Sequence, residues 1–161
     1  MATQAKPIPE GFRTVTPHIC VKGASDAIAF YKKALGAEEI SRMMSPDGKG
    51  VMHAEIKIGD SIIMLGDEYP GMKIRSPLSL GGSGSSLHIY VNDADSLFQR
   101  AVGAGATVTM PMTDMFWGDR YGKVTDPFGH EWGIATHKRD VSKEEMNKAA
   151  QEWFTKMRGN K

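Results

Sequence analysis

The apolar and polar residues of the first half alternate in several short segments, and one segment between them has a helical period. Residues 14–22 alternate so that His18 and Cys20 share one face, which predicts a strand. Between Ser25, a candidate N-cap, and Leu35 the apolar residues recur every three or four positions, which predicts a helix. Three further strands are predicted over residues 39–44, 51–58 and 61–65. The first half therefore predicts the order β-α-β-β-β.

The second half repeats this order. His18-Ile-Cys-Val matches His88-Ile-Tyr-Val at an offset of 70 residues. A helix is predicted over residues 95–102, a strand over 107–110, and a final hairpin over 120–125 and 130–136, closed by the turn sequence Asp126-Pro-Phe-Gly. Neither copy can cover its own sheet, so the repeat predicts an α+β domain in which two modules form a cupped mixed sheet around a cleft.

These patterns divide the chain into five segments. Ser142 and Glu145 form a capping box for the last one, whose apolar stripe predicts a helix that packs on its own sheet or on a second subunit. The segments are an N-terminal arm (1–13), the first module (14–78), a Gly/Ser linker (79–86), the second module (87–138) and a C-terminal helix (139–161).

Composition narrows the classes of protein. Twenty basic and 19 acidic residues give a net charge of +1, which offers no electrostatic case for nucleic acid or a membrane surface. No apolar run approaches the roughly 18 residues that cross a bilayer, and no signal-peptide pattern opens the chain. The single cysteine, Cys20, excludes an intrachain disulfide framework. We therefore expect a soluble cytoplasmic protein.

The segment 116–137 carries many side chains able to hold a ligand. Trp117 and Trp132 could stack on a flat ligand or belong to the core. Arg120 suits a carboxylate or phosphate, or forms an ion pair with Asp119 or Asp126. Two further residues could line the pocket because they share a strand face with a histidine: Cys20 with His18, and Tyr90 with His88.

The paired modules resemble the vicinal oxygen chelate superfamily, which includes glyoxalase I, fosfomycin-resistance and extradiol-dioxygenase enzymes, and bleomycin-resistance binding proteins. The chain is most similar to the PhnB-like group. The resemblance rests on the paired histidines, on Met52-His-Ala-Glu, on Gly118-Asp-Arg and on Asp126-Pro-Phe-Gly-His. It implies a small-molecule cleft and a homodimer, whereas the superfamily hosts too many activities to imply one.

Metal-bearing members of this superfamily take four ligands, one each from the first and fourth strands of both modules. Carried over to this chain, these positions fall on His18, Met64, His88 and Gly133. A divalent ion prefers oxygen or nitrogen donors, so Met64 and Gly133 indicate a degenerate site. Glu131 lies two residues before Gly133 on the same strand face, and could complete a set with both histidines.

Two functions follow from the resemblance. The first is binding of a small molecule in the cleft without chemistry, by His18, Cys20, Met64, His88, Tyr90, Trp117, Arg120 and Trp132, with no cofactor expected. The alternative is a metal-dependent lyase, isomerase or oxygenase, in which Zn, Ni, Mn or Fe binds His18, His88 and Glu131. In that case the ion acts as a Lewis acid, and Glu131 serves as a ligand or general base.

Overall fold

Each half of the chain folds into a four-stranded mixed sheet with a helix on one face, in a computed structural model that describes residues 5–159. The first module contains β1 (His18–Val21), α1 (Ala24–Leu35), β2 (Glu38–Met44), β3 (Val51–Ile58) and β4 (Ser61–Asp67), with the strand order β1-β4-β3-β2. The second contains β5 (Ser86–Tyr90), α3 (Ala94–Ala104), β6 (Thr107–Asp114), β7 (Asp119–Thr125) and β8 (Glu131–His137), with the order β5-β8-β7-β6. The predicted α+β fold of two β-α-β-β-β modules is confirmed.

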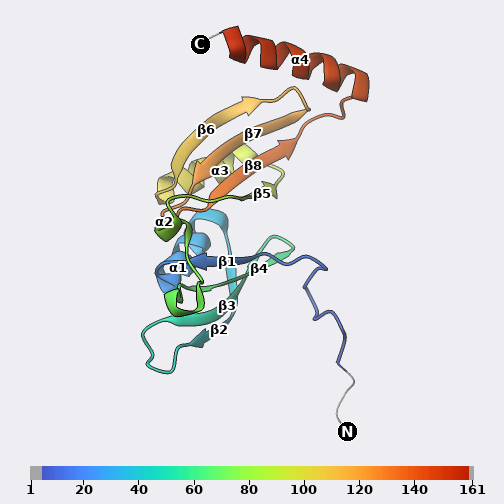
Figure 1. Cartoon of the computed structure of the whole chain (residues 1–161). Helices are drawn as coiled ribbons and strands as arrows, with labels where there is room; N and C mark the ends of the chain where they lie inside the picture. Colours follow the sequence, from blue (N-terminus) through green and yellow to red (C-terminus); the bar gives the residue numbers. More distant parts are fainter. Residues whose placement is uncertain (1–4, 160–161) are drawn as a thin grey trace.

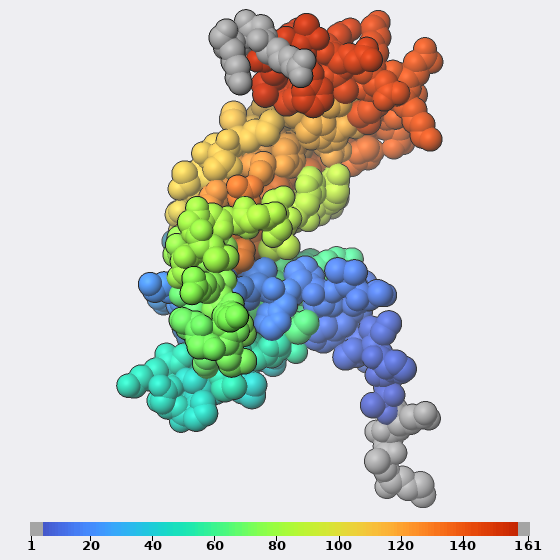
Figure 2. Space-filling view, in the orientation of Figure 1, coloured from blue at the N-terminus to red at the C-terminus, as the bar shows by residue number. Residues whose placement is uncertain are grey.

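The two modules lie one above the other, and the connection between them is more structured than predicted (Figure 1). It contains a 3-10 helix, η1 (Pro70–Met72), and one short helix, α2 (Pro77–Leu80), neither of which the sequence pattern indicated. Figure 2 shows the modules as two lobes with a notch between them on the right of the view. The N-terminal arm leaves the first module, and the C-terminal helix lies beyond the second (Figure 1).

Helices α1 and α3 join the modules by packing side by side. The Arg100 guanidinium on α3 donates hydrogen bonds to the carbonyl oxygens of Lys33 and Lys32, at 2.6 and 3.0 Å, and so satisfies acceptors at the end of α1. Tyr31 on α1 is fully buried and packs edge-on against Trp132 of β8, with ring centroids 5.5 Å apart. The core is therefore continuous across both modules.

The turn before β8 has the structure that its sequence predicts. Gly129 has a φ of 87°, and its N–H donates to the Asp126 carbonyl oxygen at 3.0 Å. The buried Asp126 carboxylate accepts four hydrogen bonds, from the N–H groups of Phe128 and His130 and from the side chains of Tyr31 and Trp132, all between 2.8 and 2.9 Å. This one carboxylate fixes the turn and attaches it to α1.

The predicted start of the first helix is wrong, because the cap comes from a distant residue. Gly23 is the N-cap, and Asp67 at the end of β4 accepts hydrogen bonds from the N–H groups of Gly23 and Ala24 at 2.8 and 2.7 Å. Ser25 lies inside the helix. The first strand is also shorter than the predicted range 14–22, since only four residues pair with β4.

The C-terminal helix α4 (Lys143–Gly159) begins at the predicted capping box, where the Ser142 hydroxyl accepts from the Glu145 N–H at 3.2 Å. It contacts the loop between β6 and β7 through Trp153, whose ring lies 6.1 Å from that of Phe116. Phe154 remains 59% exposed. None of the described helices is long and apolar enough to span a membrane.

Candidate functional site

Four rings gather on the face of the second sheet that α3 does not cover. His88 and Tyr121 stack almost in parallel, with centroids 5.4 Å apart and an interplanar angle of 6°. Tyr90 lies 4.6 Å from His88, and Trp117 lies 5.7 Å from Tyr121 in an edge-on arrangement. We call these four residues the aromatic wall. Their partly exposed faces can contact a planar molecule.

Gly133 creates the space for this stack. It pairs with His88 on β5 and with Lys123 on β7, so it lies beneath the two stacked rings. A Cβ at position 133 would lie 2.9 Å from Cε2 of Tyr121 and 3.0 Å from Nδ1 of His88. The Tyr121 ring therefore occupies the space that a side chain at this position would need.

A buried carboxylate holds two of the four rings. Asp119 is 3% exposed and accepts hydrogen bonds from the His137 Nδ1 at 2.7 Å, and from the Tyr90 hydroxyl and Trp117 Nε1 at 3.0 Å each. Burial raises the pKa of Asp119, but these hydrogen bonds outweigh it and keep the pKa below its ordinary value. An ionised Asp119 thus fixes the orientation of Tyr90 and Trp117.

The imidazole of His88 is neutral at physiological pH. Burial lowers its pKa below the ordinary value, against the opposing charge of Asp119. A neutral ring can donate one hydrogen bond and accept another. Beside it on the same face, Lys123 and Glu131 form an ion pair with Nζ and Oε2 2.6 Å apart. The polar groups near the wall therefore include both donors and acceptors.

The first sheet has a different set of side chains on its open face. His18 pairs with Met64 on β4, and its ring lies 5.7 Å from that of His53. His53 and Glu55 form the expected pair on β3, with Nε2 and Oε1 3.4 Å apart. Burial, followed by the charges of two nearby carboxylates, raises the pKa of the Cys20 thiol to about 11, so this thiol is not an activated nucleophile.

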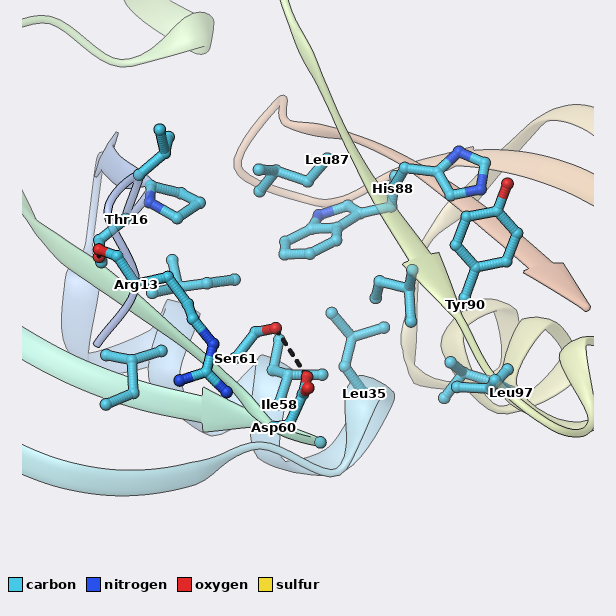
Figure 3. A pocket seen from close by; sticks show the side chains of 18 residues that line it. Arg13, Thr16, Leu35, Ile58, Asp60, Ser61, Leu87, His88, Tyr90 and Leu97 are labelled. Carbon is cyan, nitrogen blue, oxygen red and sulfur yellow. Dashed lines mark hydrogen bonds between the residues drawn. The ribbon is translucent and has the colours of Figure 1, made fainter. Parts of the chain in front are cut away.

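The two predicted ligand histidines line different cavities. His88 lines a cavity of about 530 Å³ between the modules, together with Tyr90 and Trp132 (Figure 3). His18 lines a smaller one of about 280 Å³, together with Cys20 and Glu131. The structure thus brings the predicted residues together in two groups.

Two residues of the predicted site, Trp132 and Arg120, make structural contacts within the domain. Trp132 is 1% exposed and belongs to the core, with one edge of its ring at the wall of the larger cavity. Arg120 lies on the helix-facing side of β7 and binds Asp95 of α3 through two nitrogens, Nε at 3.0 Å and Nη2 at 2.8 Å. The predicted alternatives for its ion pair, Asp119 and Asp126, were therefore wrong.

Comparisons with known proteins agree with this architecture. The model of the Glyoxalase/Bleomycin resistance protein/Dioxygenase superfamily matches residues 13–134. The chain belongs to this superfamily. It is 45% identical over 138 residues to the uncharacterized protein Rv0887c of Mycobacterium tuberculosis, which covers 84% of this chain and 81% of that protein.

Solved structures of the superfamily share the fold. A PhnB protein from Bacillus cereus superposes with a TM-score of 0.59 at 17% identity, over 77% of this chain and 99% of that one. The fosfomycin resistance protein FosX from Listeria monocytogenes, solved with Mn(II) and sulfate, superposes with a TM-score of 0.59 at 15% identity, over 83% and 95% of the two chains.

The superfamily often binds a divalent metal, but the donors of this chain do not fit one. Met64 and Gly133 are the strand partners of His18 and His88, so each histidine has a neighbour that cannot supply oxygen or nitrogen from its side chain. Within residues 5–159, no three His, Cys, Asp or Glu side chains converge closely enough to hold an ion. Glu131 is bound to Lys123.

Sequence reasoning missed Tyr121 and the structural role of Asp119. The alternation along Asp119-Arg-Tyr-Gly-Lys places Asp119, Tyr121 and Lys123 on one strand face, and this signal was available. The alternation does not predict that β8 lies between β5 and β7. Only this strand order places Tyr121 over Gly133 and against His88.

Proposed function

We propose that this protein binds a small planar molecule against the aromatic wall, without metal-dependent chemistry. The observation that carries the proposal is the stack of Tyr121 on His88 above Gly133. In this module the position that carries a metal ligand in other members has no side chain, and an aromatic ring fills the space. Ring faces of this kind bind flat molecules by stacking.

The surroundings of the wall favour binding with a defined orientation. Asp119 holds Tyr90 and Trp117, so little conformational entropy is lost when a ligand contacts them. The neutral His88 and the Lys123–Glu131 pair can hydrogen-bond to the edge of a ligand. Few precisely placed polar groups beside apolar surface are typical of small-molecule sites.

A homodimer is the second part of the proposal, because superfamily members commonly pair. It is supported by β2, an edge strand that leaves the side chains of Ile40 and Met43 about half exposed. We expect sedimentation velocity to give twice the mass of one chain, and Met43→Glu to shift the protein toward the monomer. A single-chain mass at all concentrations contradicts the dimer.

The binding proposal is tested by Tyr121→Leu, which removes one ring of the stack. A panel of planar aromatic compounds, cationic and neutral, is screened by thermal shift, and Kd is measured for the hits by quenching of tryptophan fluorescence. We expect Tyr121→Leu to weaken the hits about fivefold, since a stacked aromatic pair contributes on the order of 1 kcal/mol beyond the area it buries. The matched control Phe154→Ala removes an exposed ring on α4 and should change nothing.

The same protein, purified without an affinity tag, is assayed for metal by elemental analysis. A stoichiometric divalent ion that is lost in His88→Ala would overturn the metal-independent proposal and favour the enzyme alternative. Equal affinity of Tyr121→Leu and the parent for every hit would overturn the assignment of the wall. The cytoplasmic location and the lack of a nucleic-acid partner remain predictions from the composition.

A further inference from the structure

The larger cavity between the modules exists because the two β-hairpin turns of the repeat differ in length. His18 pairs with Met64 in the first module, and His88 pairs with Gly133 in the second. The hairpin formed by β3 and β4 therefore corresponds to the hairpin formed by β7 and β8. Three residues, 127–129, form the second turn, whereas only two, 59–60, form the first. The additional residue of the second turn is bulky and apolar.

In the second module this turn fills the gap at the edge of the other module. Phe128 is 9% exposed, and its ring lies 6.0 Å from Phe30 and 6.2 Å from Tyr31 on α1. His130 then reaches the free edge of β1, where its Nε2 lies 2.9 Å from the carbonyl oxygen of Cys20. The cavity that remains beside this edge is the smaller one, of about 280 Å³.

The corresponding gap in the first module is left open. The turn Gly59-Asp60 carries no apolar side chain toward the free edge of β5. On α3, residues at the offset of 70 from Phe30 and Tyr31 are Arg100 and Ala101, and Arg100 is bound to the end of α1. Aromatic groups are thus missing from both sides, and a cavity of about 530 Å³ remains.

The cavity has an apolar body and a charged mouth. Its wall includes Leu35, Ile89, Leu97 and Trp132, from elements of both modules. At the mouth, Figure 3 shows Arg13 extending toward Ser61 and Asp60. Within residues 5–159 the Arg13 guanidinium makes no ion pair, and its one hydrogen bond, to the Phe12 carbonyl oxygen, is a long 3.5 Å.

The β5 edge adds backbone groups to the wall. The Val91 N–H donates to the Ala135 carbonyl oxygen, so in this parallel ladder the odd-numbered residues of β5 direct their N–H and C=O groups toward β8. The backbone groups of His88 and Tyr90 are therefore directed to the opposite side, toward the cavity. This explains why both residues line it although their rings lie on the aromatic wall (Figure 3).

We infer that this cavity is a second binding site, for a small amphipathic organic anion. The apolar body of the ligand occupies the space between the modules, and its carboxylate, sulfonate or phosphonate binds the Arg13 guanidinium. Cavities of this size and polarity hold small ligands, and a planar guanidinium binds such anionic groups through two hydrogen bonds. Asp60 is the opposing charge at the mouth, so the same geometry predicts that it weakens binding.

The test uses a pair of probes that share one apolar body. 8-Anilinonaphthalene-1-sulfonate carries an anionic group, and N-phenyl-1-naphthylamine is the same body without it. Fluorescence titration of the full-length protein should show that Arg13→Ala weakens the sulfonate about tenfold and leaves the neutral probe unchanged. Asp60→Asn should tighten the sulfonate about threefold. Both residues are exposed, so these variants retain the fold.

Two controls keep the result specific to this cavity. Arg75→Ala removes an exposed arginine beside the smaller cavity and should bind the sulfonate as the parent does. Leu97→Trp fills the larger cavity and should abolish binding of both probes. An equal loss in Arg75→Ala and Arg13→Ala overturns the inference, and so does a second copy that covers the cavity and prevents binding of either probe.

Discussion

Replacement of Asp126 by alanine is expected to lower the free energy of unfolding by about 4 kcal/mol, the largest effect of any single substitution considered for this chain. The carboxylate is 4% exposed and accepts four hydrogen bonds. Its removal leaves the side chains of Tyr31 and Trp132 and two backbone N–H groups without an acceptor in the core. Each of these donors is then buried without a hydrogen bond, which costs its desolvation free energy.

Urea unfolding followed by circular dichroism measures this loss. Asp126→Asn should cost about half as much, because its carbonyl can still accept from the backbone while its amide faces the Trp132 N–H. Asp140→Ala, in which the altered side chain is fully exposed, is the control and should change the free energy of unfolding by less than about 0.5 kcal/mol. A cost below about 1.5 kcal/mol for Asp126→Ala contradicts the assigned role of this carboxylate.

Gly118→Ala is expected to cost about 3 kcal/mol. Gly118 has a φ of 100°, and a Cβ there would overlap the carbonyl oxygen of Arg139 and lie 3.1 Å from Val141. Its own carbonyl oxygen accepts from the N–H groups of Lys138 and Arg139, at 2.9 and 3.2 Å. The substitution therefore separates the loop before β7 from the segment that leads to α4.

A matched control separates backbone strain from the overlap. Gly48 also has a positive φ, of 70°, but a Cβ there would meet no atom within 4 Å. Gly48→Ala should therefore cost only about 1 kcal/mol, the strain of an alanine in the left-handed region. The two variants are compared by urea unfolding in parallel. Equal costs would show that the segment after β8 moves aside without penalty.

Local sequence patterns predicted the architecture because each strand, cap and turn of the two copies is determined by residues that are close in the sequence. The strand alternation, the capping box at Ser142 and the turn at Asp126 all depend on contacts within a few positions. The cap of α1 did not follow from such signals, because its acceptor, Asp67, lies more than 40 residues away at the end of another strand. Ser25 was the best candidate that local sequence offered.

The candidate site was predicted less completely for the same reason. His88 was identified from the internal repeat, Tyr90 from the strand face it shares with His88, and Trp117 from the aromatic residues of segment 116–137; all three lie on the aromatic wall. Tyr121 was missed because its contact with His88 crosses an intervening strand at a glycine. The partner of Arg120 was predicted wrongly because Asp95 lies on a helix that packs against β7 only in the folded chain.

Because the two hairpin turns differ in length and in contacts, they differ in how well they tolerate insertions, deletions and substitutions. Phe128 and His130 make the second hairpin part of the contact between modules, so shortening that turn removes packing that both modules share. The Gly59-Asp60 turn carries no such contact across the repeat, so its length and sequence are free to vary without unfolding the domain. An insertion at this turn would place new residues beside the open cavity. It would close the cavity, or change which ligand fits it, without altering the rest of the fold.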